Sequence, residues 1–203
     1  NGSGGGGGSN GAGGGGNGDD NEQEDENPLR DVFFGMCLVY GVRHFLIEPR
    51  HIPSESMEPT FQIGDHLVVD KISSKWRDYA RNDVVIFRPP SSFLSAIPSG
   101  MISKDSRVIK RIVALSGDTV QVKHGRLFVN GERQDETFIR ELARYKYGPI
   151  TVPEGHVFVL GDNRNNSFDG HVWGVLPKAD IIGRATLKYW PPRKVGRIYG
   201  APA

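Results

Sequence analysis

The chain has 203 residues, of which 37% are hydrophobic and 24% charged, and its formal net charge is +1 at pH 7. Its single cysteine, Cys37, excludes an intramolecular disulfide and a multi-cysteine metal site. The basic residues are scattered through strand-like segments, without a helix-turn-helix, zinc-finger or stacked-aromatic pattern. This distribution excludes the usual classes of nucleic-acid-binding protein.

The N-terminal part is too polar to form a core. Residues 1–18 are almost entirely Gly, Asn and Ser, and residues 19–26 form an acidic run. Because such residues bury little apolar area, nothing offsets the entropy lost when the backbone is ordered. Residues 1–30 are therefore predicted to be a disordered linker, natural or engineered. The rest of the chain is about six units positive, which suits an acidic surface such as lipid headgroups.

One segment is apolar enough to suggest a membrane anchor. Residues 32–42 are largely apolar, Arg43 and His44 follow, and residues 45–47 are apolar again. A bilayer requires about 20 mostly apolar residues, so a span is possible only if the two polar side chains reach the headgroups. We predict a membrane-anchor helix at residues 31–47. An amphipathic interfacial helix and a buried core helix are the alternatives.

From Glu48 onward, short apolar runs alternate with Gly, Pro, Asn and Asp, which is typical of a mostly β domain. We predict a catalytic β domain at residues 48–203, with a small inserted subdomain at about 118–156. The expected strands are residues 66–70, 84–88, 107–115, 119–123, 126–129, 157–160 and 181–189. His124 and Gly125 are predicted to form the tight turn of a hairpin.

A serine-containing turn at residues 52–60 is the first candidate for chemistry. Pro53 and Pro59 restrict the backbone on either side of Ser54 and Ser56, so the hydroxyl groups lie on a stiff, non-helical turn. A hydroxyl that is held in place is what nucleophilic attack requires. An ordinary Ser-rich turn is the alternative.

Lys110 is the second candidate. In a strand it shares a face with Val108, Ile112 and Ala114, whereas Arg111 points the other way. Burial disfavours the ammonium form, so the pKa of such a lysine falls from about 10.4 and its neutral amine becomes a base. The alternative is a lysine whose stem lies on the apolar face and whose charge stays in water.

A polar loop at residues 161–171 follows the expected strand at 157–160. Its side chains alternate hydrogen-bond donors and acceptors, which suits a wall that supports a site. An ordinary Asn-rich turn is the alternative.

Together, segments 52–60, 81–87, 107–118 and 161–171 resemble the type I signal peptidase family, and the resemblance covers about residues 33–192. It implies a mostly β, signal-peptidase-type fold with a small β subdomain and an N-terminal membrane-anchor helix. It also implies a membrane-bound serine endopeptidase that uses a Ser/Lys dyad.

The resemblance also implies the roles of individual residues. Ser56 is the expected nucleophile and Lys110 the expected base. The Ser54 hydroxyl and the Ser56 amide are expected to form the oxyanion hole, and Ser167 to orient the lysine amine. The remaining supporting residues are an Asp162–Arg111 ion pair and Asp169. His171 stands where many bacterial members carry Arg, so its contact with Asp169 is pH-dependent or a neutral hydrogen bond.

Details at residues 45–50, 167–174 and 189–192 are similar to the plastid and cyanobacterial branch, the thylakoidal processing peptidases. The implied location is the thylakoid membrane, with the catalytic domain in the lumen; a bacterial plasma membrane is the alternative. The basic residues that flank the apolar segment predict the opposite membrane orientation. Arg43 and Arg50 follow the apolar segment and only Arg30 precedes it, so the positive-inside rule leaves the β domain on the cis side.

The expected reaction is acyl transfer through Ser56, with no metal or cofactor. The expected substrates are preproteins cleaved after a small-x-small motif and bound as an added β-strand. Two other classes stay open: a non-catalytic, membrane-anchored β scaffold, and a self-cleaving repressor-type Ser/Lys protease. The latter needs a DNA-binding domain where this chain has glycine and an apolar segment.

Overall fold

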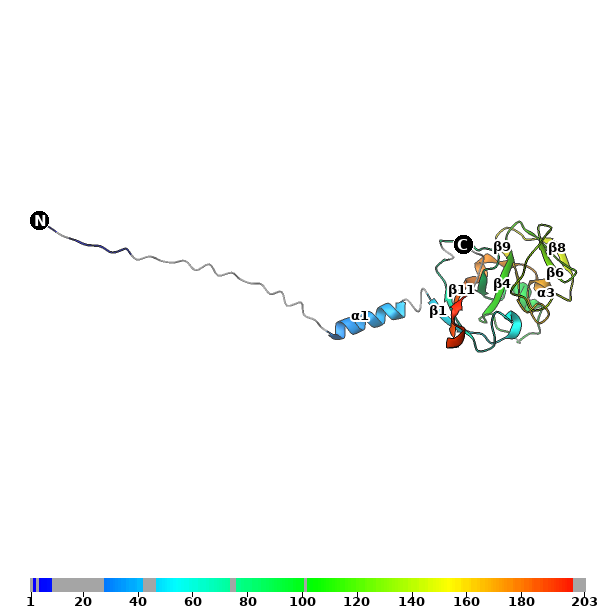
Figure 1. The fold of residues 1–203 in the computed structure, drawn as a ribbon, viewed down its shortest axis with the longest axis horizontal. Coiled ribbons are helices and arrows are strands. Elements are labelled where there is room, and N and C mark those ends of the chain that lie inside the picture. Colours follow the sequence, from blue (N-terminus) through cyan, green and yellow to red (C-terminus); the bar gives the residue numbers. More distant parts are fainter. Residues whose placement is uncertain are drawn as a thin grey trace.

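The protein's structure is a computed structural model that describes residues 2, 4–8, 28–41, 47–73, 76–100 and 102–198. Within these residues it is mostly β, as predicted. The strands gather at one end, and a helix near the N-terminus lies apart from them (Figure 1). They form two antiparallel sheets.

The larger sheet has eight strands among the described residues, in the order β1-β2-β11-β3-β4-β9-β10, with β12 paired to β11. The bounds of these strands are β1 Ile47–His51, β2 His66–Asp70, β3 Val84–Phe87, β4 Val108–Ala114, β9 His156–Leu160, β10 Leu176–Pro177, β11 Ile181–Trp190 and β12 Gly196–Arg197. All residues of β3 and all but the first residue of β4 are buried, because these two strands lie in the middle of the sheet.

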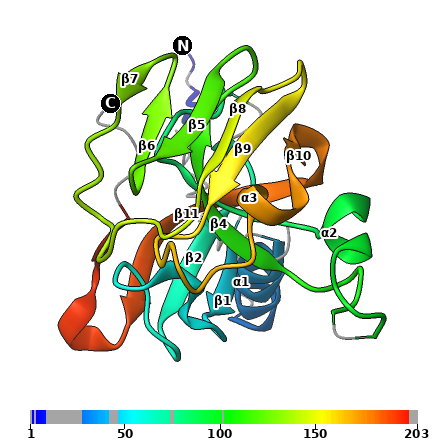
Figure 2. The same cartoon turned by 90° about the vertical axis from the view of Figure 1, so that its right-hand side faces the viewer.

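The smaller sheet has the order β7-β6-β5-β8 and lies between β4 and β9 in the sequence. Its strands are β5 Thr119–Lys123, β6 Arg126–Val129, β7 Glu132–Arg133 and β8 Tyr147–Thr151. Figure 2 shows this sheet on one side of β4 and β9, with β1 and β2 on the other. It falls within the range predicted for an inserted subdomain.

The hairpin of the small sheet has the predicted turn. Lys123 pairs with Arg126, which leaves His124 and Gly125 as the two turn residues. Both have positive φ, 51° and 75°, as a type I′ turn requires.

Among the described residues, the helices other than α1 are short. The helices are α1 Pro28–Gly41, α2 Ser91–Ser95, α3 Gly170–Trp173, and the 3-10 turns η2 Glu55–Met57, η4 Lys178–Asp180 and η5 Pro192–Lys194. Among the described residues, no helix has the length and apolar character needed to cross a membrane.

The boundaries of the predicted anchor need correction. The helix α1 begins at Pro28, inside the range predicted as linker, because proline is well suited to the first position of a helix. Residue Ile47, predicted as the last anchor residue, instead begins β1 and pairs with Asp70. The intervening residues 42–46, including Arg43 and His44, lie outside the described part of the chain.

Within the described residues, three apolar clusters make up the core. One lies under the serine turn and contains Ile52, Met57 and Phe61. Another joins the small sheet to β4 and β9. The third packs Trp173 of α3 against Phe87 and Phe93. Since Met57 directly follows Ser56 and is fully buried, the core fixes the position of the serine turn.

Candidate active site

Ser56 lies in the 3-10 turn η2, between two buried apolar residues. Ile52 and Met57 enter the core on either side of the turn, and the Ile52 amide donates to the Asp65 carbonyl at 2.8 Å. The serine itself is half-buried. Its hydroxyl oxygen lies 3.3 Å from that of the exposed Ser54. The turn therefore presents two hydroxyl groups side by side, and the role of Ser54 in an oxyanion hole stays a prediction.

Lys110 lies in β4, and its side chain ends at Ser56. Its Nζ donates to Ser56 Oγ at 2.7 Å, although 54 residues separate the two along the chain. Only 3% of the lysine is exposed to solvent. Burial lowers the pKa of Lys110 from 10.5 to about 8, and the charges of Asp169 and Asp162 oppose this lowering. Near neutral pH, a fraction of the protein molecules therefore holds an uncharged Lys110 amine beside the Ser56 hydroxyl.

The polar loop at residues 161–171 lies against the serine turn. The Asn163 amide donates to the Ser56 carbonyl oxygen at 3.1 Å, and the Asn163 side chain donates to the Glu55 carbonyl at 3.1 Å. Asn166 adds a bond to the Glu55 carboxylate at 3.2 Å. The loop therefore holds the two backbone carbonyl groups that flank the Ser56 side chain, those of Glu55 and Ser56.

Ser167 lies in this loop, and its hydroxyl makes no hydrogen bond within the described residues. The bond to the Lys110 amine that the resemblance implied is therefore absent from this structure. Ser167 is nevertheless close to Ser56, because a Cβ placed on Gly161 would meet both the Ser167 side chain and the Ser56 carbonyl. Orientation of the lysine by Ser167 stays a prediction.

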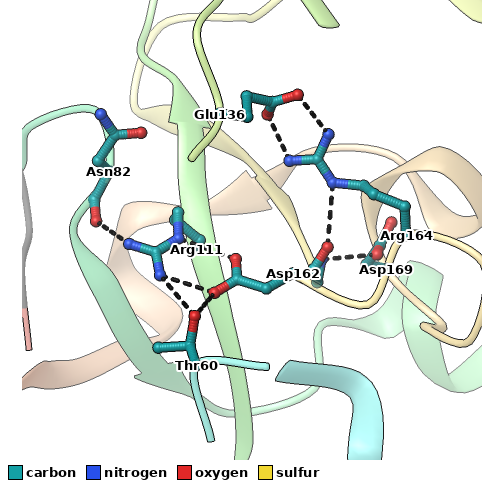
Figure 3. A network of polar contacts seen from close by, with 8 residues as sticks. Thr60, Asn82, Arg111, Glu136, Asp162, Arg164 and Asp169 are labelled. Atoms are coloured by element: carbon teal, nitrogen blue, oxygen red, sulfur yellow. Dashed lines mark hydrogen bonds and ion pairs between the residues drawn. The ribbon is translucent and has the colours of Figure 1, made fainter. Parts of the chain in front are cut away.

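The Asp162–Arg111 pair forms as expected from the sequence. Arg111 donates from Nε and Nη2 to the two Asp162 oxygens at 2.8 and 2.7 Å, and both side chains are buried. Thr60 donates to the same carboxylate, and Arg111 also donates to the Asn82 carbonyl at 2.9 Å (Figure 3). This network links the serine turn, β4 and the polar loop, because each contributes one member.

Asp169 fixes the far end of the loop. One of its oxygens accepts from the Gly161 amide at 2.7 Å, and the other lies 2.7 Å from His171 Nδ1. Asp169 also accepts from the His171 amide and so begins the helix α3. The predicted contact between Asp169 and His171 is thus formed, and Tyr145 stacks on the imidazole at 3.9 Å.

Sequence reasoning missed three residues of this region, Thr60, Glu136 and Arg164. Arg164 is fully buried, donates to the Gly161 carbonyl at 3.1 Å and forms a bidentate pair with Glu136. The place of Arg164 in the polar loop was a local signal that it belongs to the site. Glu136 gave no such signal, because it lies 28 residues away in an irregular stretch of the insert.

The arrangement has the parts of an acyl-transfer site. The Ser56 hydroxyl contacts a desolvated amine, an arrangement that can activate a nucleophile, and the Ser54 hydroxyl lies beside it. Within the described ranges, no group of three or more His, Cys, Asp or Glu side chains could hold a metal ion.

Comparison with known proteins gives concordant matches. The family model "Signal peptidase, peptidase S26" matches residues 27–190. The chain is 44% identical over 161 residues to "Probable signal peptidase I-2" of Synechocystis sp., covering 79% of this chain and 71% of the relative. Identity to "Signal peptidase I" of Leptolyngbya laminosa is 39% over 175 residues, covering 86% and 84%.

A plant protein is also similar. "Thylakoidal processing peptidase 1, chloroplastic" of Arabidopsis thaliana is 49% identical over 153 residues, covering 75% of this chain. The match spans 45% of the plant protein's own length.

Proposed function

We propose that Ser56 is the nucleophile and Lys110 the general base with which this chain removes signal peptides. The chain belongs to the signal peptidase family (peptidase S26). The observation that carries the proposal is the 2.7 Å distance between Lys110 Nζ and Ser56 Oγ. The burial that lowers the amine's pKa to about 8 supports the same roles.

In the first step, the neutral Lys110 amine takes the Ser56 proton as the hydroxyl oxygen attacks the scissile carbonyl carbon. The Ser54 hydroxyl and the Ser56 amide stabilise the negative charge that develops on the carbonyl oxygen. The C–N bond then breaks, and the Lys110 ammonium gives its proton to the leaving amine. The signal peptide is left as an ester on Ser56.

In the second step, the amine is neutral again and takes a proton from a water molecule, which attacks the ester carbonyl. The ester bond breaks, Ser56 Oγ recovers the proton from Lys110, and the signal peptide leaves with a free carboxylate. The Asp162–Arg111 pair and Asp169 hold the loop against the serine turn throughout.

The substrates are preproteins with signal peptides, as for the family. We propose that the segment before the cleavage site binds as an added β-strand and ends in a small-x-small motif, with shallow pockets for the small residues.

We further propose that the protein acts at the thylakoid membrane with its catalytic domain in the lumen and in contact with membrane lipid. Similarity to the chloroplastic peptidase of Arabidopsis thaliana supports this location, and the cyanobacterial relatives support the bacterial plasma membrane as the alternative. Import of the labelled precursor into isolated chloroplasts, followed by fractionation and protease protection, distinguishes the two. Recovery outside the thylakoid fraction would contradict the thylakoid location.

Cleavage of a presequence substrate by single variants tests the dyad. We expect Ser56→Ala and Lys110→Ala each to abolish cleavage while circular dichroism shows a folded protein. The exposed residues Ser92 and Lys104 provide matched controls, and their alanine variants keep wild-type activity.

The pH dependence of kcat tests the same assignment. Because the neutral amine is the active form, kcat should rise with pH through a midpoint near the Lys110 pKa of about 8. The same rise of kcat around pH 8 in an active Lys110→Arg variant would contradict the base assignment, because a guanidinium stays protonated at that pH. Loss of cleavage on replacing one of the chain's six histidines by alanine, with Lys110→Ala still active, would also contradict it, because that result would indicate a Ser-His enzyme.

A further inference from the structure

The structure contains a second buried ion pair near the site, and it joins the small-sheet insert to the polar loop. Arg164 donates from Nη1 and Nη2 to the two oxygens of Glu136 at 2.8 and 2.5 Å. The exposed fractions of the two side chains are 1% and 6%. Burying two charges carries a large desolvation penalty, which good geometry and further hydrogen bonds only partly offset. The pair therefore contributes little net stability for the charges it buries, which suggests a role other than stabilising the fold.

Glu136 belongs to the stretch between β7 and β8, which covers the outer side of the polar loop. The Arg144 amide donates to the Asn165 side chain at 2.8 Å, and Tyr145 stacks on His171. On its inner side the same loop holds the serine turn through Asn163. The loop therefore lies between the insert and the nucleophile. The Glu136–Arg164 pair is a buried charged contact on the insert side, and Figure 3 shows its two side chains facing each other.

Gly161 connects this pair to Ser56. The Gly161 carbonyl accepts from Arg164 Nε at 3.1 Å, and the Gly161 amide donates to Asp169 at 2.7 Å. Between these two bonds, the Gly161 α-carbon lies so close to Ser56 that a methyl group there would come within 2.5 Å of the Ser56 carbonyl oxygen. A displacement of Gly161 towards Ser56 therefore has to move Ser56, because the space between them does not hold even one added methyl group.

We propose that Glu136 and Arg164 are a positioning pair that sets the Ser56 hydroxyl against the Lys110 amine, an inference that rests on the dyad proposed above. Glu136 fixes the guanidinium, the guanidinium fixes the Gly161 carbonyl, and Gly161 supports the Ser56 backbone. The insert thereby takes part in catalysis without touching the substrate bond. Its contribution acts on kcat, since a small displacement of the nucleophile slows attack and leaves substrate binding in place.

The test measures kcat and KM for Glu136→Gln, which keeps the size of the side chain and removes the charge. We expect kcat to fall by ~10- to 100-fold, the range for small misplacements of reacting groups, with KM within about twofold of wild type. Glu132→Gln is the matched control, because Glu132 is exposed in β7 of the same insert, and it keeps wild-type kcat. All rates are measured well below the melting temperature of each variant.

A double-mutant cycle separates positioning from loss of the fold. If the two residues act as one unit, the Glu136→Gln/Arg164→Gln double variant has the kcat of Arg164→Gln alone. Multiplicative losses would overturn the proposal, and so would recovery of wild-type kcat by Glu136→Gln at a temperature where it is fully folded. Wild-type kcat in Glu136→Gln with inactive Ser56→Ala would refute the positioning pair alone. An active Ser56→Ala would refute the dyad itself.

Discussion

Replacement of Lys110 by methionine should stabilise the protein while it abolishes cleavage. Burial lowers the lysine pKa from 10.5 to about 8, so folding at pH 7 places an ammonium group where the neutral form is preferred. At ~1.4 kcal/mol per pKa unit, this preference costs about 3 kcal/mol at pH 7. Methionine is similar in length, carries no charge and is free of this penalty.

The pH dependence gives the sign of the effect. Between about pH 8 and 10.5 the unfolded lysine holds a proton that the folded one has lost, so the free energy of unfolding rises with pH in this window. The penalty is complete below about pH 8 and disappears above 10.5. We expect the stability advantage of Lys110→Met to be about 3 kcal/mol at pH 7 and about 2 kcal/mol at pH 9.

Guanidinium unfolding of both proteins at the two pH values measures this difference. Changes in packing do not depend on pH and cancel when the two pH values are compared, and the pH dependence of the Lys110–Ser56 contact is already part of the folded-state pKa. Lys104→Met, at an exposed lysine, shows no such dependence. An advantage that stays constant between pH 7 and pH 9 would refute the reasoning, because the Lys110 amine would then titrate alike in the folded and unfolded states.

Two further substitutions test the surroundings of the proposed dyad. Gly161→Ala places a methyl group against the Ser167 hydroxyl and 2.5 Å from the Ser56 carbonyl, so kcat should fall by ~100-fold; unchanged kcat would show that the loop can shift freely. Asp162→Asn leaves the buried Arg111 without its charged partner, which should lower the free energy of unfolding by ~3–5 kcal/mol in denaturant titrations. A loss below 1 kcal/mol would mean that the guanidinium finds other partners or water.

Local sequence patterns located much of the fold. Strands such as β2 and β5 alternate buried and half-buried residues, which is a period that can be read directly. The strands β1 and β8 were missed because each contains a proline and little alternation, and Pro49 and Pro149 argue against a strand. Those two segments are strands because they pair with β2 and β5, and no local signal encodes that pairing.

The sequence by itself determined which side chains have the chemistry for the candidate site: a serine held between prolines, a lysine in an apolar strand and a polar loop after another strand. Tertiary structure decided which of them meet. Packing of the serine turn on β3 and β4 places Lys110 at Ser56, and pairing of β4 with β9 places Arg111 at Asp162, across more than 50 residues in each case. Tertiary structure also placed Glu136 on Arg164. Strand order and register arise from the packing of the whole chain, so contacts between distant residues cannot be obtained from local periodicity.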